Sequence, residues 1–133
     1  MPDSPEQSTT GPGHHDLDDE PPDPEDVTLV TLARSSRVRA AAAEGAAVRD
    51  ETGRTYTAAT VALPSLALSA LQAAVVLAAS SGASSLEAAA VVRDDTDHEL
   101  PAHDVAAVHD LGGAWTPIHV ADADGVVRAT VRT

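Results

Sequence analysis

The amino-acid sequence predicts an α/β domain in three layers, with helices on both faces of a mixed five-stranded sheet. First, segments with the apolar spacing of helices alternate along residues 27–133 with short strand-like runs. Second, two of these runs flank turn-forming residues and predict a hairpin over residues 46–62, which makes one strand pair antiparallel. Third, the later strands are separated by helices, and such connections place helices against a sheet.

The first half of the domain contains two predicted helices with the hairpin between them. Apolar spacing predicts a helix over residues 27–43, with Asp26 as its N-cap and a glycine beyond its end. The hairpin turns at residues 50–53, which are Asp, Glu, Thr and Gly. A second helix is predicted over residues 64–81, with Pro64 in its first turn. This helix is apolar on all sides, which predicts burial on all sides.

The second half alternates strands with one further helix. A buried strand is predicted over residues 86–92, and a helix over residues 101–112 that ends at a glycine. Two more strands are predicted over residues 116–121 and 126–131, joined by a turn at residues 122–125. The predicted order is therefore α, β, β, α, β, α, β, β.

The composition divides the chain into two parts. Residues 1–26 hold six of the nine prolines and nine carboxylates, and they contain no arginine. Such a segment has too little apolar surface to offset the entropy lost on ordering. We therefore expect a disordered acidic tail over residues 1–26 and one folded domain over residues 27–133.

Charge and cysteine content exclude several function classes. The chain has no cysteine, so disulfide scaffolds, zinc ribbons and thiol nucleophiles are excluded. Its 8 basic residues face 21 acidic ones, and this balance argues against nucleic acid as a partner. The apolar run at residues 63–79 is shorter than the roughly 20 residues of a membrane span, so no membrane association is expected. We expect a cytoplasmic protein.

Several local strings resemble the cytidine deaminase family over residues 27–127. The leading helix, a Gly-Ala-Ala strand, an acidic turn with Gly and Arg, and two later strands carry this resemblance. They lie at residues 29–34, 45–48, 50–54, 88–92 and 116–125. The resemblance implies the three-layer cytidine deaminase-like fold.

The resemblance also implies which positions would carry the chemistry. In that family a zinc ion held by three side chains activates water, and a glutamate that is not a ligand transfers protons. The first ligand and the glutamate fall on Ser69 and Leu71, or, in an alignment without a gap, on Leu71 and Ala73. The other two ligands, from Pro-Cys-x-x-Cys, fall on Ala102 and Val105.

The positions of the substrate contacts are changed as well. The Asn-x-Glu that grips the sugar in relatives falls on Thr60 and Ala62, which with Pro101 would line a residual pocket. The sequence thus predicts no catalytic residue, no metal site and no cofactor, and favours a structural or protein-interaction module. Two alternatives remain open at this point: a nucleoside deaminase with an atypical site, and a noncatalytic nucleoside-binding protein.

The remaining polar residues carry weaker signals. His103 and His109 lie about 240° apart around the predicted helix, so they do not share a face. With the neighbouring carboxylates, we interpret them as a hydrated surface. His119, inside a predicted strand, is interpreted as a hydrogen-bonded structural histidine. Arg34 and Arg37 share one side of the first helix, and they form either a solvated face or a seat for an anion. The serines lack the G-x-S-x-G signature of a hydrolase.

The core predicted by the sequence is rich in alanine, and alanine buries little area per residue. The cytidine deaminase family is usually oligomeric, so the resemblance implies a homo-oligomer, either a dimer or a tetramer. An unidentified protein partner is left open. Trp115 either anchors its loop or lies at an interface, and the sequence does not distinguish these roles.

Overall fold

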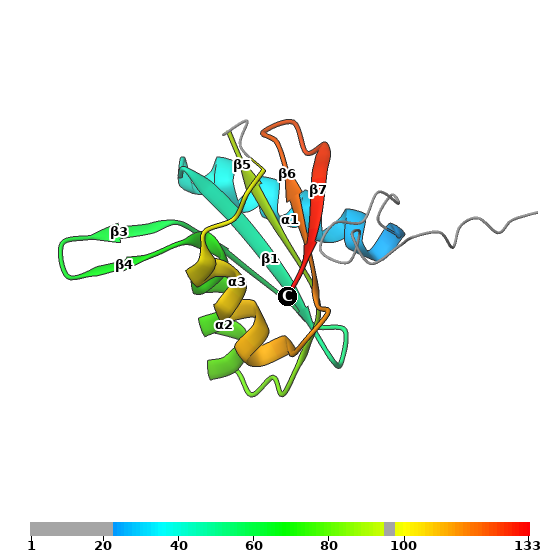
Figure 1. Ribbon diagram of the computed structural model, residues 1–133. Helices are drawn as coiled ribbons and strands as arrows, with labels where there is room; N and C mark the ends of the chain where they lie inside the picture. The colour runs from blue at the N-terminus through cyan, green and yellow to red at the C-terminus, as the bar shows by residue number, and fades with distance from the viewer. Residues whose placement is uncertain (1–22, 95–97) are drawn as a thin grey trace, which may run out of the picture.

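The computed structural model describes residues 23–94 and 98–133. Within these residues, three helices and a five-stranded sheet form three layers (Figure 1). The helices are α1 (Pro24–Ala40), α2 (Ala70–Ser80) and α3 (Ala102–Gly112). The strands of the sheet are β1 (Glu44–Asp50), β2 (Thr55–Ala59), β5 (Leu86–Arg93), β6 (Pro117–Ala121) and β7 (Val127–Arg132). A separate hairpin consists of β3 (Val61–Leu63) and β4 (Leu66–Leu68).

The sheet is mixed, with strand order β2-β1-β5-β6-β7. β1 pairs antiparallel with both β2 and β5, and β6 pairs antiparallel with β7. The parallel pair is β5 and β6, which α3 connects. The predicted fold class and the predicted mixed five-stranded sheet are therefore confirmed.

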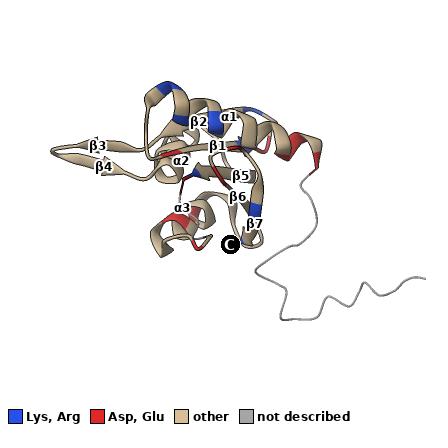
Figure 2. Ribbon diagram, turned by 90° about the horizontal axis from the view of Figure 1, so that it is seen from above, with Lys and Arg blue, Asp and Glu red and all other residues tan. Residues whose placement is uncertain are grey.

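Helices cover both faces of the sheet, with α1 on one side and α2 and α3 on the other (Figure 2). Successive side chains of strand β5 alternate between the two faces of the sheet, and both faces are covered by helices. Its Ala88, Ala90 and Val92 belong to the core under α1, whereas Ala89 and Val91 belong to the core under α2 and α3. A strand buried on both faces explains its continuous apolar sequence.

The first helix begins and ends three residues earlier than predicted. Asp23, not Asp26, is its N-cap, and the Asp23 carboxylate accepts a hydrogen bond of 3.0 Å from the backbone N–H of Asp26. Pro24 follows at the start of the helix, a position where proline is favoured. The helix ends at Ala40, before Ala41 in the left-handed conformation. Residues 23–26 thus belong to the domain. The rest of the predicted tail, residues 1–22, lies outside the described residues.

The predicted helix over residues 64–81 is wrong in its first six residues. β3 and β4 form a hairpin there, with Pro64 in its turn, and α2 begins at Ala70. A capping box between Ser69 and Gln72 starts the helix. The hairpin projects from the body of the molecule (Figure 1), and Leu63 and Leu66 near its tip are exposed.

The predicted hairpin over residues 46–62 is confirmed as β1 and β2, but it ends at Ala59, and residues 61–62 belong to β3. The later strands and α3 are confirmed within one residue at their ends. Among the described residues, no helix is both long and apolar enough to cross a membrane.

Candidate functional site

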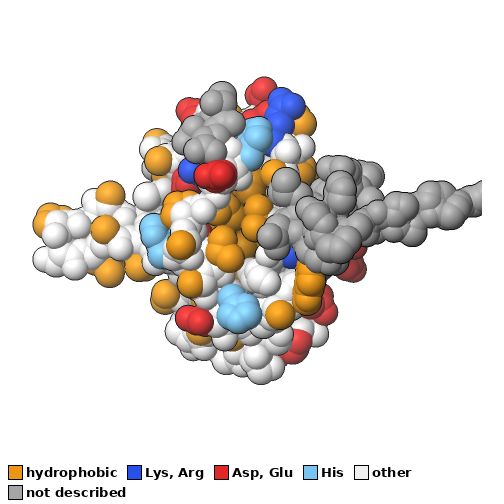
Figure 3. Space-filling model, viewed as in Figure 1, with side chains coloured by type: hydrophobic (Ala, Val, Ile, Leu, Met, Phe, Trp, Pro, Cys, Tyr) orange, Lys and Arg blue, Asp and Glu red, His pale blue; other side chains and the backbone are white. Residues whose placement is uncertain are grey.

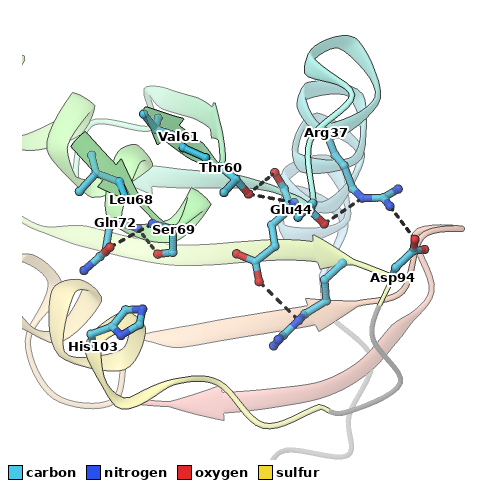
Figure 4. A pocket seen from close by; sticks show the side chains of 13 residues that line it. Arg37, Glu44, Thr60, Val61, Leu68, Ser69, Gln72, Asp94 and His103 are labelled. Atoms are coloured by element: carbon cyan, nitrogen blue, oxygen red, sulfur yellow. Dashed lines mark hydrogen bonds and ion pairs between the residues drawn. The ribbon is translucent and has the colours of Figure 1, made fainter. Parts of the chain in front are cut away.

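A cavity of about 760 Å³ opens where the hairpin meets the body of the domain (Figure 4). The end of α1, the start of β1, the β3–β4 hairpin and the N-terminal ends of α2 and α3 form its walls. Its apolar lining comes from Ala43, Val61, Ala62, Ala67 and Leu68. Its polar lining comes from Arg37, Glu44, Thr60, Ser69, Gln72, Arg93, Asp94 and His103.

Ser69 joins the N-terminal ends of α2 and α3 at the back of this cavity. Its hydroxyl accepts a hydrogen bond of 3.1 Å from the backbone N–H of Gln72, which caps α2. The same hydroxyl donates a hydrogen bond of 2.6 Å to Oδ1 of Asp104, in the first turn of α3. Nε2 of His103 lies 3.1 Å from that oxygen. The Asp104 side chain is fully buried, so this carboxylate is not part of the predicted hydrated surface.

Glu44 places its carboxylate in the cavity. Its Oε2 lies 3.5 Å from Nε of Arg93, and both side chains are largely buried. Burial raises the pKa of the Glu44 carboxyl, the positive charge of Arg93 lowers it in part, and the negative charge of Asp104 raises it further. These residues stand opposite each other because β1 and β5 pair in the register Glu44 to Arg93. This pair was not predicted from the sequence.

At the rim of the cavity, Arg37 donates a hydrogen bond of 3.2 Å from Nε to the carbonyl oxygen of Ala43 and forms an ion pair of 3.0 Å with Asp94. Arg34 instead donates to the carbonyl oxygen of Ala123 at the β6–β7 turn. The two arginines that share a side of α1 therefore contact different parts of the fold.

The family model "Cytidine deaminase-like" matches residues 22–125. The chain belongs to this cytidine deaminase-like family. It is also similar in structure to solved cytidine deaminases. One from Burkholderia pseudomallei has a TM-score of 0.69 and 22% identity, covering 78% of this chain and 90% of the other. One from Mycobacterium leprae has a TM-score of 0.60 and 23% identity, covering 77% and 90%.

A cytidine deaminase from Mycobacterium tuberculosis shares 27% identity, with a TM-score of 0.58, over 68% of this chain and 80% of the other. No curated protein matches the sequence of this cytidine deaminase-like chain.

At the positions that the family would use for zinc, this cytidine deaminase-like chain has one serine and otherwise residues with alkyl side chains. Ser69 lines the cavity, whereas Leu71 is fully buried in the core and Ala73 is nearly so. Ala102 is exposed and Val105 is half-buried on α3. Zinc requires thiolate, imidazole or carboxylate donors. Within residues 23–94 and 98–133, no three His, Cys, Asp or Glu side chains are grouped closely enough to hold a metal ion. The residues present do not fit a zinc ion.

Two of the three residues predicted to line a residual pocket line this cavity. Thr60 and Ala62 line the cavity, and Pro101 lies outside its lining, at the cap of α3. The Thr60 hydroxyl accepts from the backbone N–H of Glu44 at 3.0 Å and donates to the Glu44 carbonyl oxygen at 3.3 Å. Thr60 thus fixes the start of β1 beside the cavity.

His119 is a structural histidine, as predicted. Its Nε2 lies 2.8 Å from Oδ2 of Asp26, and its Nδ1 lies 2.8 Å from the hydroxyl of Thr130. The other Asp26 oxygen lies 2.9 Å from NH1 of Arg49. This network ties the first turn of α1 to β1, β6 and β7, and it explains why Asp26 is not the N-cap. Trp115 is half-exposed in the loop before β6.

Proposed function

We propose that this cytidine deaminase-like protein does not deaminate nucleosides and serves as a binding or interaction module. The observation that carries the proposal is the buried hydrocarbon of Leu71 and Ala73, the two positions that the resemblance allows for the proton-transferring glutamate, together with hydroxyl and hydrocarbon at the ligand positions. An alkyl side chain transfers no proton, and a serine hydroxyl with two alkyl groups makes no zinc site.

The contact between Ser69 and Asp104 supports the same proposal. The family would join the starts of these two helices through a metal, whereas here a hydrogen bond of 2.6 Å joins them directly. The link between α2 and α3 therefore forms without a metal. Selection for the fold can then continue after selection for the reaction has ended.

The test is a metal analysis of the purified chain combined with an assay of cytidine deamination in added zinc. A zinc-containing cytidine deaminase assayed in parallel serves as the positive control. We expect substoichiometric zinc and no ammonia release above the buffer rate. Stoichiometric zinc, with turnover that a chelator abolishes, would overturn the proposal and support a deaminase with an atypical site.

A second candidate function is noncatalytic nucleoside binding, which the retained cavity of about 760 Å³ favours. Thermal unfolding with cytidine, uridine and nucleotides tests this candidate. A ligand at about 100 times its dissociation constant stabilises the folded state by about 2.7 kcal/mol, which is readily measured. No shift at millimolar nucleoside counts against this candidate and leaves protein interaction as the function.

We also propose that the chain forms a dimer or tetramer. Large apolar side chains are exposed on the hairpin and on α2, and those of the projecting hairpin are visible in Figure 3. They are Leu63, Leu66, Val76 and Leu77, which are 59%, 52%, 51% and 43% exposed. Light scattering at micromolar concentration measures the mass, and the mass of a single chain would contradict this proposal.

A further inference from the structure

We propose that the cavity binds a small organic cation, such as an amine or amidine with an apolar body, through the carboxylate of Glu44. The inference rests on the cavity being retained as a binding site, and it does not depend on the loss of catalysis.

The positively charged side chains on the walls are already engaged. Arg37 contacts Asp94 and the carbonyl oxygen of Ala43. Arg93 contacts Glu44, and its NH1 donates a hydrogen bond of 3.0 Å to the carbonyl oxygen of Glu99. An incoming anion would have to displace these partners, so the cavity offers little to an anionic ligand.

The carboxylates have acceptor capacity left. A carboxylate can accept about four hydrogen bonds. The Glu44 carboxylate accepts a backbone hydrogen bond from Ala70 and lies 3.5 Å from Nε of Arg93, which leaves part of this capacity unused, and its side chain is 16% exposed. Asp104, behind Ser69, has no hydrogen-bond donor to Oδ2 among the described residues, and its charge acts on Glu44. The free acceptor capacity that faces the cavity is therefore that of Glu44, and the buried charge of Asp104 adds negative potential beside it, which suits a ligand that donates hydrogen bonds and carries positive charge.

The rest of the cavity determines the ligand's body. Figure 4 shows the Glu44 side chain reaching into the space between Ser69 and Arg37, below the strands of the hairpin. The hairpin contributes Val61, Ala62, Ala67 and Leu68, which suit an aliphatic or aromatic group. A cationic head beside Glu44 and an apolar body under the hairpin would satisfy both regions.

The experiment compares benzamidine with benzamide, its neutral analogue, by calorimetric titration of the full chain. We expect benzamidine to bind at least tenfold more tightly than benzamide. In Glu44→Gln, benzamidine should bind about 10 to 100 times more weakly, the range for a hydrogen bond to a charged group, with benzamide unaffected. Asp110→Asn, an exposed change on α3, is the matched control and should bind as the natural chain does.

A second variant keeps the test decisive should Glu44→Gln fail to fold. Ala67→Phe places a large side chain on an exposed hairpin strand at the cavity wall, away from the core, and should abolish benzamidine binding. Equal affinity for the two compounds, unchanged binding by either variant, or no benzamidine binding would overturn the inference. Cytidine binding that Ala67→Phe blocks, without benzamidine binding, would overturn it and support the nucleoside-binding candidate instead.

Discussion

Replacing Ser69 with alanine should destabilise the domain more than any other single loss of a hydroxyl on α2. The variant loses the N-cap of α2, at a cost of about 1 kcal/mol, because the backbone N–H of Gln72 loses its acceptor. It also deprives the fully buried Asp104 of its hydroxyl donor, which costs about 1–3 kcal/mol. The expected total is about 2–4 kcal/mol.

Urea unfolding followed by circular dichroism measures this change. Ser80→Ala is the matched control, because that exposed hydroxyl contacts a backbone oxygen at the other end of α2, 3.3 Å away. We expect its effect to stay within about 0.5 kcal/mol. In an Asp104→Ala background, which removes the acceptor of the Ser69 hydroxyl, Ser69→Ala should cost about 1 kcal/mol, since only the capping contribution remains. An equal cost of the Ser69 change in both backgrounds would refute the coupling between the two helices.

Three further variants test other parts of the fold. Gly45→Ala should leave little soluble protein on expression, because its Cβ would clash with the backbone oxygen of Ala33 in α1. Asp26→Ala should lower the free energy of unfolding by about 1–3 kcal/mol in a urea titration, since it leaves Nε2 of the buried His119 without its hydrogen-bond partner while Arg49 keeps Glu87. Hydrogen bonds from the hydroxyls of Thr52 and Tyr56 lower the pKa of the Asp50 carboxyl well below its usual value. The ionised form of Asp50 therefore stabilises the fold above about pH 3.9, and this stabilisation is lost as the pH falls towards the folded-state pKa. Asp50→Asn should reduce stability at pH 7 and show a weaker loss between pH 4 and pH 2; parallel acid titrations would contradict this.

Much of the fold could be predicted because, in most segments, the spacing of apolar residues fits either a strand or a helix but not both. The exception is residues 61–68, where Val, Ala, Leu and Pro satisfy both periods. Pro64 suits the first turn of a helix as well as a hairpin turn. The feature that distinguishes a hairpin from a helix over these residues is the capping box of Ser69 and Gln72, a polar N-cap followed three residues later by Gln, because it marks the start of the helix at residue 70.

The candidate site was predicted in part. Thr60, Ala62 and Ser69 could be placed beside the cavity because the resemblance supplied their positions. Glu44 and Arg93 are distant in sequence, and they meet through the register between β1 and β5, which neither residue type nor local spacing reveals. Long-range strand register is the information that a single sequence did not supply.

The buried contacts of Asp26 also determine where the chain can be shortened. A fragment that starts at residue 27, the boundary that composition suggests, would leave His119 without its carboxylate partner, would leave Arg49 with Glu87 alone, and would remove the Asp23 cap. A fragment that keeps all of these contacts therefore starts no later than Asp23. Proteolysis that trims the molecule from its amino end should meet its first resistant bond near that residue.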